Sequence, residues 1–183
     1  MKEHPENPTG TQEPPHPLDA MRDVYRSMEF HTEENDDRIT VKIALENMEV
    51  VVTSWGNPND VATVIVHLPV RATGEFRAKT GEFLHRLNYD SKRKFWEIDY
   101  NDGEIRLGAY TDTLLGSLTE EHFRGILHCM VVTADIVFPY LTSVLSGRMA
   151  PDFAADQADA AIYAHWTKGN SPEDEDGKEE GGE

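Results

Sequence analysis

The most regular pattern in the chain is a pair of short alternating segments followed by one long helical repeat. Apolar and polar residues alternate over 95–100 and 104–110, which predicts two strands, because a strand points successive side chains to opposite faces. Asp102-Gly103 between them favours a type I′ turn, whose two central residues take positive φ. A two-residue loop there fixes the register of the cross-strand pairs, which are Ile98–Leu107, Trp96–Ala109 and Asp99–Arg106. Gly103 is therefore expected to be a structural residue.

The next segment predicts a single long helix. Its apolar residues recur at spacings of three and four, which gives the helix one continuous apolar stripe. Thr119 is the expected N-cap, and Gly147 is the expected stop. Pro139 lies inside this helix and removes the hydrogen bond to the carbonyl of Asp135. We therefore expect a bend at this structural proline.

The rest of the chain adds three strands and three helices. Alternation predicts strands over 39–45, 48–52 and 61–70, the first two joined by a two-residue turn, and helical spacing predicts helices over 18–30, 74–87 and 152–166. The order is then α-β-β-β-α-β-β-α with an extra C-terminal helix. Such an order favours an α+β fold in which helices cover a twisted, five-stranded antiparallel sheet.

Four apolar residues fall on the other face of these strands. If the registers hold, they are Val51, Trp55, Ile65 and Phe95. A contiguous apolar patch would mark an interface, whereas scattered exposed apolar residues need no explanation. Contiguity depends on strand order, which the pattern leaves open. These four residues form the candidate partner-binding face.

Composition limits the choice of partner. The formal net charge is −17, of which residues 171–183 contribute seven acids and one lysine. An acidic protein is a poor ligand for nucleic acid or an anionic membrane, because both interactions begin with attraction to phosphate. The basic cluster at 92–94 is too small to reverse this and is typical of a solvated strand entrance.

The ends of the chain differ in composition from its middle. Residues 1–17 are rich in proline and residues 167–183 are rich in Gly, Glu and Asp, so both are predicted to be disordered tails. Between them we expect a domain over 18–148 and an extra helix over 149–166, which either docks on the domain or serves as a handle for a partner. Without a signal peptide or an apolar run of transmembrane length, we expect a cytoplasmic protein.

No set of residues indicates catalysis or metal binding. Glu97 and Asp99 share a strand face, but the expected pairing with Arg106 favours a structural role. His122 and His128 are six residues apart and so do not share a helix face, and the single Cys129 lies on an apolar stripe. We therefore expect no catalytic residue, no metal and no cofactor.

Several segments together resemble the YbjN-like family of bacterial domains. They are 68–71, 83–88, 95–106, 118–121 and the positions Asp135 and Pro139. The resemblance spans roughly Leu18 to Arg148 and lies in core and turn residues. It implies the type III secretion chaperone-like fold, a common dimeric state and a role in binding or regulation, the family being described as sensory-transduction regulators. It carries over no catalytic residues.

These observations lead to three hypotheses about function. The first is a cytoplasmic homodimer that binds a protein segment on a face or edge of its sheet, in a chaperone-like or regulatory capacity. The alternative is a small-molecule sensor whose ligand lies between the long helix and the sheet. An enzyme is the third and least favoured, since it requires a cleft of convergent polar groups.

Overall fold

The computed structural model describes residues 15–35, 37–57, 60–89, 91, 94–113 and 116–168. Nearly all of both expected tails lies outside these ranges. The described elements are α1 (Pro17–Ser27), β1 (Thr32–Asn35), β2 (Arg38–Ala44), β3 (Glu49–Gly56), β4 (Val61–Arg71), α2 (Phe76–Tyr89), β5 (Lys94–Ile98), β6 (Glu104–Asp112), α3 (Glu120–Leu145) and α4 (Pro151–Thr167).

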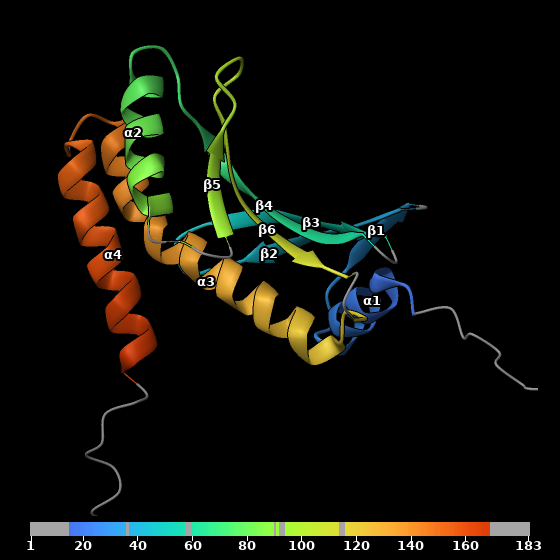
Figure 1. Cartoon of the computed structure of the whole chain (residues 1–183). Helices are drawn as coiled ribbons and strands as arrows, with labels where there is room; N and C mark the ends of the chain where they lie inside the picture. The colour runs from blue at the N-terminus through green and yellow to red at the C-terminus, as the bar shows by residue number, and fades with distance from the viewer. Residues whose placement is uncertain are drawn as a thin grey trace, which may run out of the picture.

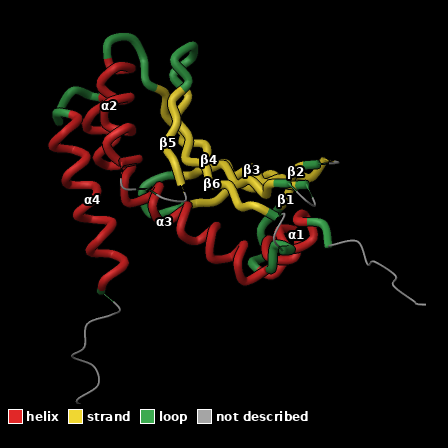
Figure 2. The backbone as a smooth tube through the Cα atoms, in the orientation of Figure 1, coloured by secondary structure: helices red, strands yellow, loops and turns green. Residues whose placement is uncertain are grey.

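The strands form one antiparallel sheet in the order β1-β2-β3-β4-β6-β5. Helices α1 and α3 lie beneath this sheet and α2 stands beside β5, while β4 and β6 curve upward toward the β5–β6 loop (Figure 1, Figure 2). The α+β prediction is confirmed. The prediction of five strands is wrong, because the sheet has six.

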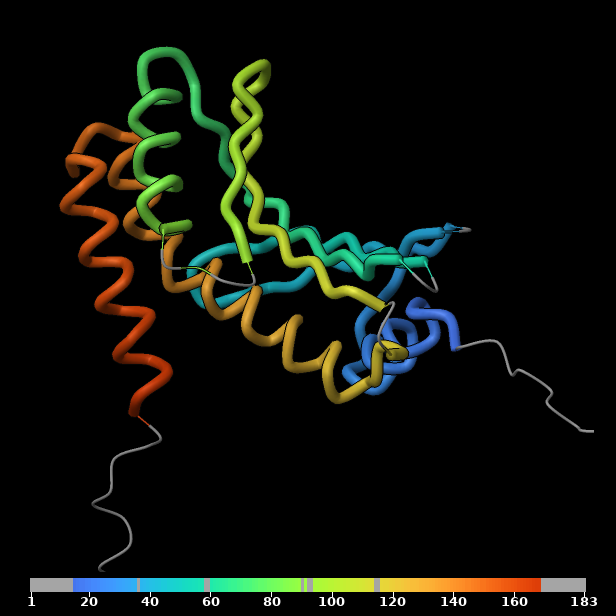
Figure 3. Tube along the Cα trace, viewed as in Figure 1, coloured from blue at the N-terminus to red at the C-terminus, as the bar shows by residue number. Residues whose placement is uncertain are grey.

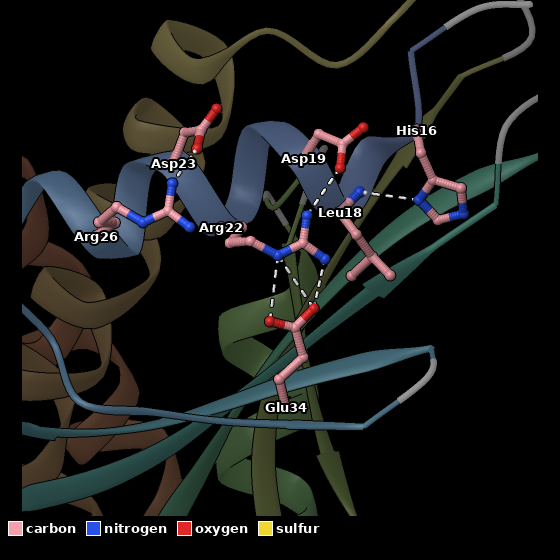
Figure 4. A network of polar contacts seen from close by, with 7 residues as sticks. All are labelled: His16, Leu18, Asp19, Arg22, Asp23, Arg26 and Glu34. Carbon is pink, nitrogen blue, oxygen red and sulfur yellow. Dashed lines mark hydrogen bonds and ion pairs between the residues drawn. The ribbon is translucent and has the colours of Figure 1, made fainter.

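The missed strand is β1, whose sequence Thr-Glu-Glu-Asn contains no apolar residue. Alternation of apolar and polar residues cannot reveal a strand that has no apolar side chain to bury. An ion pair with α1 holds it instead (Figure 4): Arg22 on α1 donates from Nε to both carboxylate oxygens of Glu34, at 3.1 and 3.2 Å, and from Nη1 to Asp19. The hydrogen bond from Arg22 holds the pKa of the Glu34 carboxyl below its ordinary value.

The registers of the β2–β3 hairpin agree with the sequence prediction. Val41 lies opposite Val52, and Ile43 lies opposite Val50. These side chains are buried on the face that the helices cover, with every second residue of β4 and β6. Apolar alternation fixed this register because a slip of one residue would expose the whole set.

The β5–β6 hairpin is paired two residues away from the predicted register. Trp96 lies opposite Leu107 and not Ala109, and Arg106 lies opposite Glu97, to which its Nε donates at 2.6 Å, and not Asp99. The loop is longer than the predicted two-residue turn. A shift of two keeps each side chain on its predicted face, which is why the alternation alone did not detect it.

Gly103 is required by the longer loop. Its φ is +79°, and a Cβ at this position would lie 1.9 Å from the carbonyl oxygen of Ala72. The Ala72 amide donates to the Gly103 carbonyl at 2.8 Å, so the loop is anchored to the end of β4. Both the conformation and the close approach favour glycine here.

Helix α3 spans the sheet and is capped as predicted. The Thr119 side chain accepts from the backbone amide of His122 at 3.1 Å. By length and composition alone this helix could cross a membrane, so the expectation of no apolar run of that length is wrong. Its buried side chains nevertheless belong to the core cluster that it shares with the sheet, which is typical of a core helix.

The carbonyl of Asp135, which Pro139 deprives of its helical donor, has another partner. Asn47, in the β2–β3 turn, contacts this carbonyl with Nδ2 at 3.4 Å and donates its backbone amide to Asp135 Oδ1 at 2.9 Å. The helix changes direction in its C-terminal part, where Pro139 lies (Figure 3). The proline therefore also creates a docking point for a distant turn.

Helix α4 is docked on the domain. It packs against α2 and α3 (Figure 3). Its small side chains Ala154, Ala155 and Ala158 are buried. Trp166 near its end lies edge-on to His128 of α3, with ring centroids 5.7 Å apart. Of the two possibilities the sequence left open, docking is the one observed.

The Asn47 contact should depend on the proline. Asn47→Ala is expected to lower the free energy of unfolding by up to about 1 kcal/mol, because the Asp135 carbonyl loses its donor. In a Pro139→Ala background residue 139 regains an amide for that carbonyl, so the same substitution should cost less. Urea unfolding of the four proteins measures both costs, and equal costs in the two backgrounds would contradict this account.

Tyr25 should make the protein sensitive to alkali. Its side chain is fully buried with the hydroxyl 2.7 Å from Ser54 Oγ, and burial raises the pKa of Tyr25 well above its ordinary value. The unfolded chain releases this proton near pH ~10 and the folded chain does not, so stability should fall as pH rises past about 10.

A matched variant isolates this effect. Tyr25→Phe combined with Ser54→Ala removes the titrating group without leaving a buried hydroxyl unpaired. Urea midpoints from pH 8 to about pH 11 should decline less steeply in this variant than in the unaltered protein. Parallel declines would refute the assignment to Tyr25.

Candidate functional site

The four residues of the candidate partner-binding face lie on one continuous surface of the sheet. Strand order places β3 beside β4, β4 beside β6 and β6 beside β5. The registers then align the outward residues in three neighbouring rows, which are Trp55–Thr63–Tyr110, Thr53–Ile65–Gly108–Phe95 and Val51–His67–Arg106–Glu97. We call this surface the outer face.

The centre of the outer face is packed although no helix packs there. Ile65 is 4% exposed but is not a member of the core cluster that the helices share with the sheet. Gly108 has no side chain, and the ring of Phe95 and the end of Ile65 meet over it, both within 3.3 Å of where a Cβ would stand. Because Gly108 has no side chain, Ile65 of β4 and Phe95 of β5 can approach each other across β6 and form one apolar patch.

Aromatic side chains extend this patch on both sides. Phe95 stacks on Tyr110 with ring centroids 4.7 Å apart, and Tyr110 is 49% exposed. Trp55 is half-buried beneath the guanidinium of Arg38, 4.9 Å from the ring centroid. Tyr110, Thr53 and Thr63 were missed by the sequence analysis, although their strand positions carry the same signal as the four residues that it named.

None of the described helices covers the outer face. Figure 1 shows α1 and α3 on the opposite side of the sheet, α2 beside β5, and α4 on the far side of α2. The sheet bends so that the outer face lies on the inside of the curve (Figure 2). The centre of the patch at Ile65 is buried by its own neighbours, so its accessible part is the half-buried Val51, Trp55 and Phe95 and the exposed Tyr110. Apolar side chains gathered in this way on an uncovered face are typical of a binding surface.

Polar side chains rim the patch, and many of them pair with one another. His67 Nδ1 lies 2.9 Å from Glu104 Oε1, and Arg106 is paired with Glu97, which raises the pKa of the Arg106 guanidinium. On β2, Arg38 and Lys42 face outward with no ion pair to any described residue. Glu33, opposite Thr40, and Glu49, opposite Ala44, face the same way, so this side of the rim carries charges of both signs.

A second feature lies on the covered face, at the end of the sheet where β5 begins. There the first half of α3 and the strand β6 border an open cavity of about 590 Å³, which we call the α3–β6 groove. Its walls include Ala109 from β6 and Gly125, Ile126 and Met130 from α3. A Cβ at Gly125 would meet nothing within 4 Å, so the helix leaves room at this point.

The side chain of Lys94 enters the α3–β6 groove. Lys94, the first residue of β5, is half-buried and donates from Nζ to Thr133 Oγ1 at 2.6 Å, with Cys129 Sγ at 3.8 Å. The sequence analysis interpreted it as part of a solvated strand entrance, which is wrong for Lys94. Its alternation with Trp96 and Ile98 could have placed it on the covered face.

The candidate chemistry that the sequence analysis set aside does not converge on a site. Glu97 is paired with Arg106, and the backbone amide of Asn101 donates to Asp99 Oδ1 at 2.7 Å, so the two carboxylates have separate structural roles. Within the described residues, no three His, Cys, Asp or Glu side chains are grouped so that they could hold a metal ion.

Comparisons with known proteins give one structural similarity. No known family profile matches the chain, and no curated protein matches it in sequence. Among solved structures, that of YbjN, a proposed transcription regulator from E. coli, covers 82% of this chain and 93% of its own, with 12% identity and a TM-score of 0.45. At that TM-score and identity the likeness carries no inference about function.

The packing over Gly108 can be tested directly. Gly108→Val should push the Phe95 ring off the sheet, because the new Cβ would stand 2.8 Å from the Phe95 ring and 3.1 Å from Ile65 Cδ1. We expect a folded protein that is less stable by about 0.5–1.5 kcal/mol and binds more of an apolar dye, since the Phe95–Tyr110 stack is lost.

Gly125→Ala is the matched control. It also adds a side chain to a glycine, but in a helix and in open space, so it should raise stability by about 0.5–1 kcal/mol and leave dye binding unchanged. Thermal unfolding and dye fluorescence measure both variants. Equal behaviour of the two would show that Gly108 does not organise the patch.

Proposed function

We propose that this chain is a non-enzymatic protein-binding module, chaperone-like or regulatory in role, which holds a segment of a partner protein on the outer face of its sheet. The observation that carries this proposal is the continuous patch formed by Val51, Trp55, Ile65, Phe95 and Tyr110 on a face that no described helix covers. Aromatic residues at the centre of such a patch are the usual anchors of a protein interface.

The outer face suits a partner better than either edge of the sheet. The edge strand β1 carries Glu33 and Glu34, and charged side chains on an edge discourage the addition of another strand. The other edge strand, β5, is short, and its Lys94 points toward α3. The outer face instead offers a partner an apolar surface surrounded by polar side chains.

The accessible side chains of the outer face define the partner further. On β2 the outward cations Arg38 and Lys42 lie beside the outward acids Glu33 and Glu49, so the rim there does not select one sign of charge. We therefore expect a partner segment whose apolar side chains cover Trp55, Phe95 and Tyr110. The net charge of −17 makes nucleic acid and anionic membranes unfavourable partners.

The proposal includes a cytoplasmic location and a homodimer, the oligomeric state that the resemblance to the YbjN-like family implies. A second copy would use a surface other than the outer face, which the partner segment occupies. Light scattering after size-exclusion chromatography measures the oligomeric state, and a monomer at micromolar concentration would remove this part of the proposal.

The small-molecule sensor is a second candidate function, favoured by the α3–β6 groove. Its volume of about 590 Å³ lies within the usual range for ligand pockets, roughly 300–1,000 Å³. The groove lies between the long helix and the sheet, as that hypothesis requires. It is distinct from the outer face, so the two functions do not exclude each other.

A crosslinking experiment tests the outer face. A photo-crosslinking residue replaces Thr53 or, separately, Tyr110, and the tagged protein is irradiated in an extract of its native cells. We expect both positions to capture the same partner protein, through a peptide that contains apolar residues. Trp55→Asp with Phe95→Asp should reduce this capture by roughly tenfold or more, because it places charges in the centre of the patch.

Two exposed aromatic residues away from the patch provide a matched control. Tyr89 is 86% exposed and Tyr163 is 73% exposed, so Tyr89→Asp with Tyr163→Asp makes the same kind of change elsewhere. Captured partners should be unchanged in this variant. Equal capture by both double variants would overturn the proposal, and crosslinks only to a second copy of the chain would assign the outer face to dimerisation instead.

A further inference from the structure

We propose that the α3–β6 groove binds a small organic acid with a single carboxylate and an apolar body. This site is separate from the outer face and does not depend on the proposed protein partner. The inference starts from Lys94, whose ammonium is half-buried in an apolar cavity and has no ion pair with any described residue. No described acid pairs with this half-buried ammonium, so an anionic ligand in the groove would gain a charge-assisted hydrogen bond there.

Lys94 retains hydrogen-bonding capacity for such a ligand. Its ammonium has three donors, of which Thr133 Oγ1 accepts one at 2.6 Å and Cys129 Sγ is a weak partner at 3.8 Å. Thr133 is itself buried, so the contact fixes the ammonium at one position on α3. A carboxylate would accept from the remaining donor in a charge-assisted hydrogen bond.

The rest of the groove suits an apolar body. Ala109 and Met130 are buried in its floor, Ile126 forms part of its wall, and the absent side chain at Gly125 keeps it open. From Thr133 to Gly125 the helix rises roughly 12 Å, at ~1.5 Å per residue. That length fits a medium-chain acyl group or an aromatic ring on a short linker.

The charges along α3 orient the ligand. Lys94 lies at the Thr133 end of the groove, whereas Glu121 and His122 line the opposite end. A carboxylate is therefore favoured beside Lys94, and a second carboxylate at the far end of the same molecule would approach Glu121. The geometry favours monocarboxylates over dicarboxylates and over cations of the same length.

Binding of octanoate to the full chain tests the proposal. Octanoate should raise the melting temperature and give a saturable titration by calorimetry. Octanedioate, octan-1-ol and octylammonium have the same carbon number, and each should bind at least about tenfold more weakly, because each lacks a lone carboxylate. Amide shifts measured by NMR should centre on Ile126, Cys129 and Thr111.

Two variants test the residues that the proposal names. Lys94→Met keeps the aliphatic stem, and it should weaken octanoate about tenfold or more without changing the binding of octan-1-ol. Gly125→Phe fills the groove from an exposed helix position with free space around it, so it should fold and weaken both ligands. It provides the decisive measurement if Lys94→Met does not fold.

Three results would overturn the proposal. They are no binding of octanoate at millimolar concentration, equal affinity for octylammonium, and unchanged octanoate binding in both variants. Trp55→Asp alone alters β3 on the outer face, leaves the Phe95–Tyr110 stack in place and should leave octanoate binding intact. Loss of octanoate binding in that variant would show that the acid binds to the outer face, and would also overturn the assignment to the groove.

Discussion

The structure depends on a sheet whose helices pack on one face only. The covered face buries alternate residues of every strand from β2 to β6 in one cluster with side chains of α1, α2, α3 and α4. This burial is the main stabilising term of the fold, since free energy gained on folding scales with the apolar area removed from water. The outer face is therefore free to carry apolar residues that the fold does not need. Ile65 and Phe95 pack there against each other and over Gly108 without a helix.

The long helix α3 on the covered face is held in place by contacts at its start, along its length and near its end. Its N-terminus is capped by Thr119, its apolar stripe is buried from Phe123 to Val144, and its C-terminal part meets the turn at Asn47. Asn47 docks mainly on the Asp135 carboxylate, and Pro139 adds a further contact because it leaves the Asp135 carbonyl without a helical donor. Small residues of α4 pack against α3 and α2 on the side away from the sheet.

Features that bury apolar residues were predictable from the sequence, and features that depend on polar contacts were not. The register of Val41 with Val52 follows from alternation, because an error would expose apolar side chains. The shift of Trp96 from Ala109 to Leu107 keeps the same face buried, so alternation cannot distinguish the two registers. Strand β1 is stabilised by an ion pair between Arg22 and Glu34, residues that no local pattern connects.

The same limit applies to the two candidate sites. The alternation of side chains along each strand was enough to assign four residues to one face, namely Val51, Trp55, Ile65 and Phe95. Whether these residues form one patch could be decided only from the strand order and from the absence of a side chain at Gly108. Lys94 could not be recognised as a groove residue, because its partner Thr133 lies on a helix far along the chain. Alternation with Trp96 could place Lys94 on the covered face, but it could not identify the helix residue that its ammonium meets.

The outer face and the α3–β6 groove share the edge of the sheet formed by β5 and β6. Lys94 and Phe95 are neighbours on β5 and point to opposite faces, one into the groove and one onto the patch. Tyr110 borders the groove and also stacks on Phe95. A ligand that moves the start of β5 would therefore change the aromatic stack, and a partner that fixes the stack would change the groove. By thermodynamic linkage the two effects must be equal in free energy, so the size of either one measures how strongly the two surfaces are coupled.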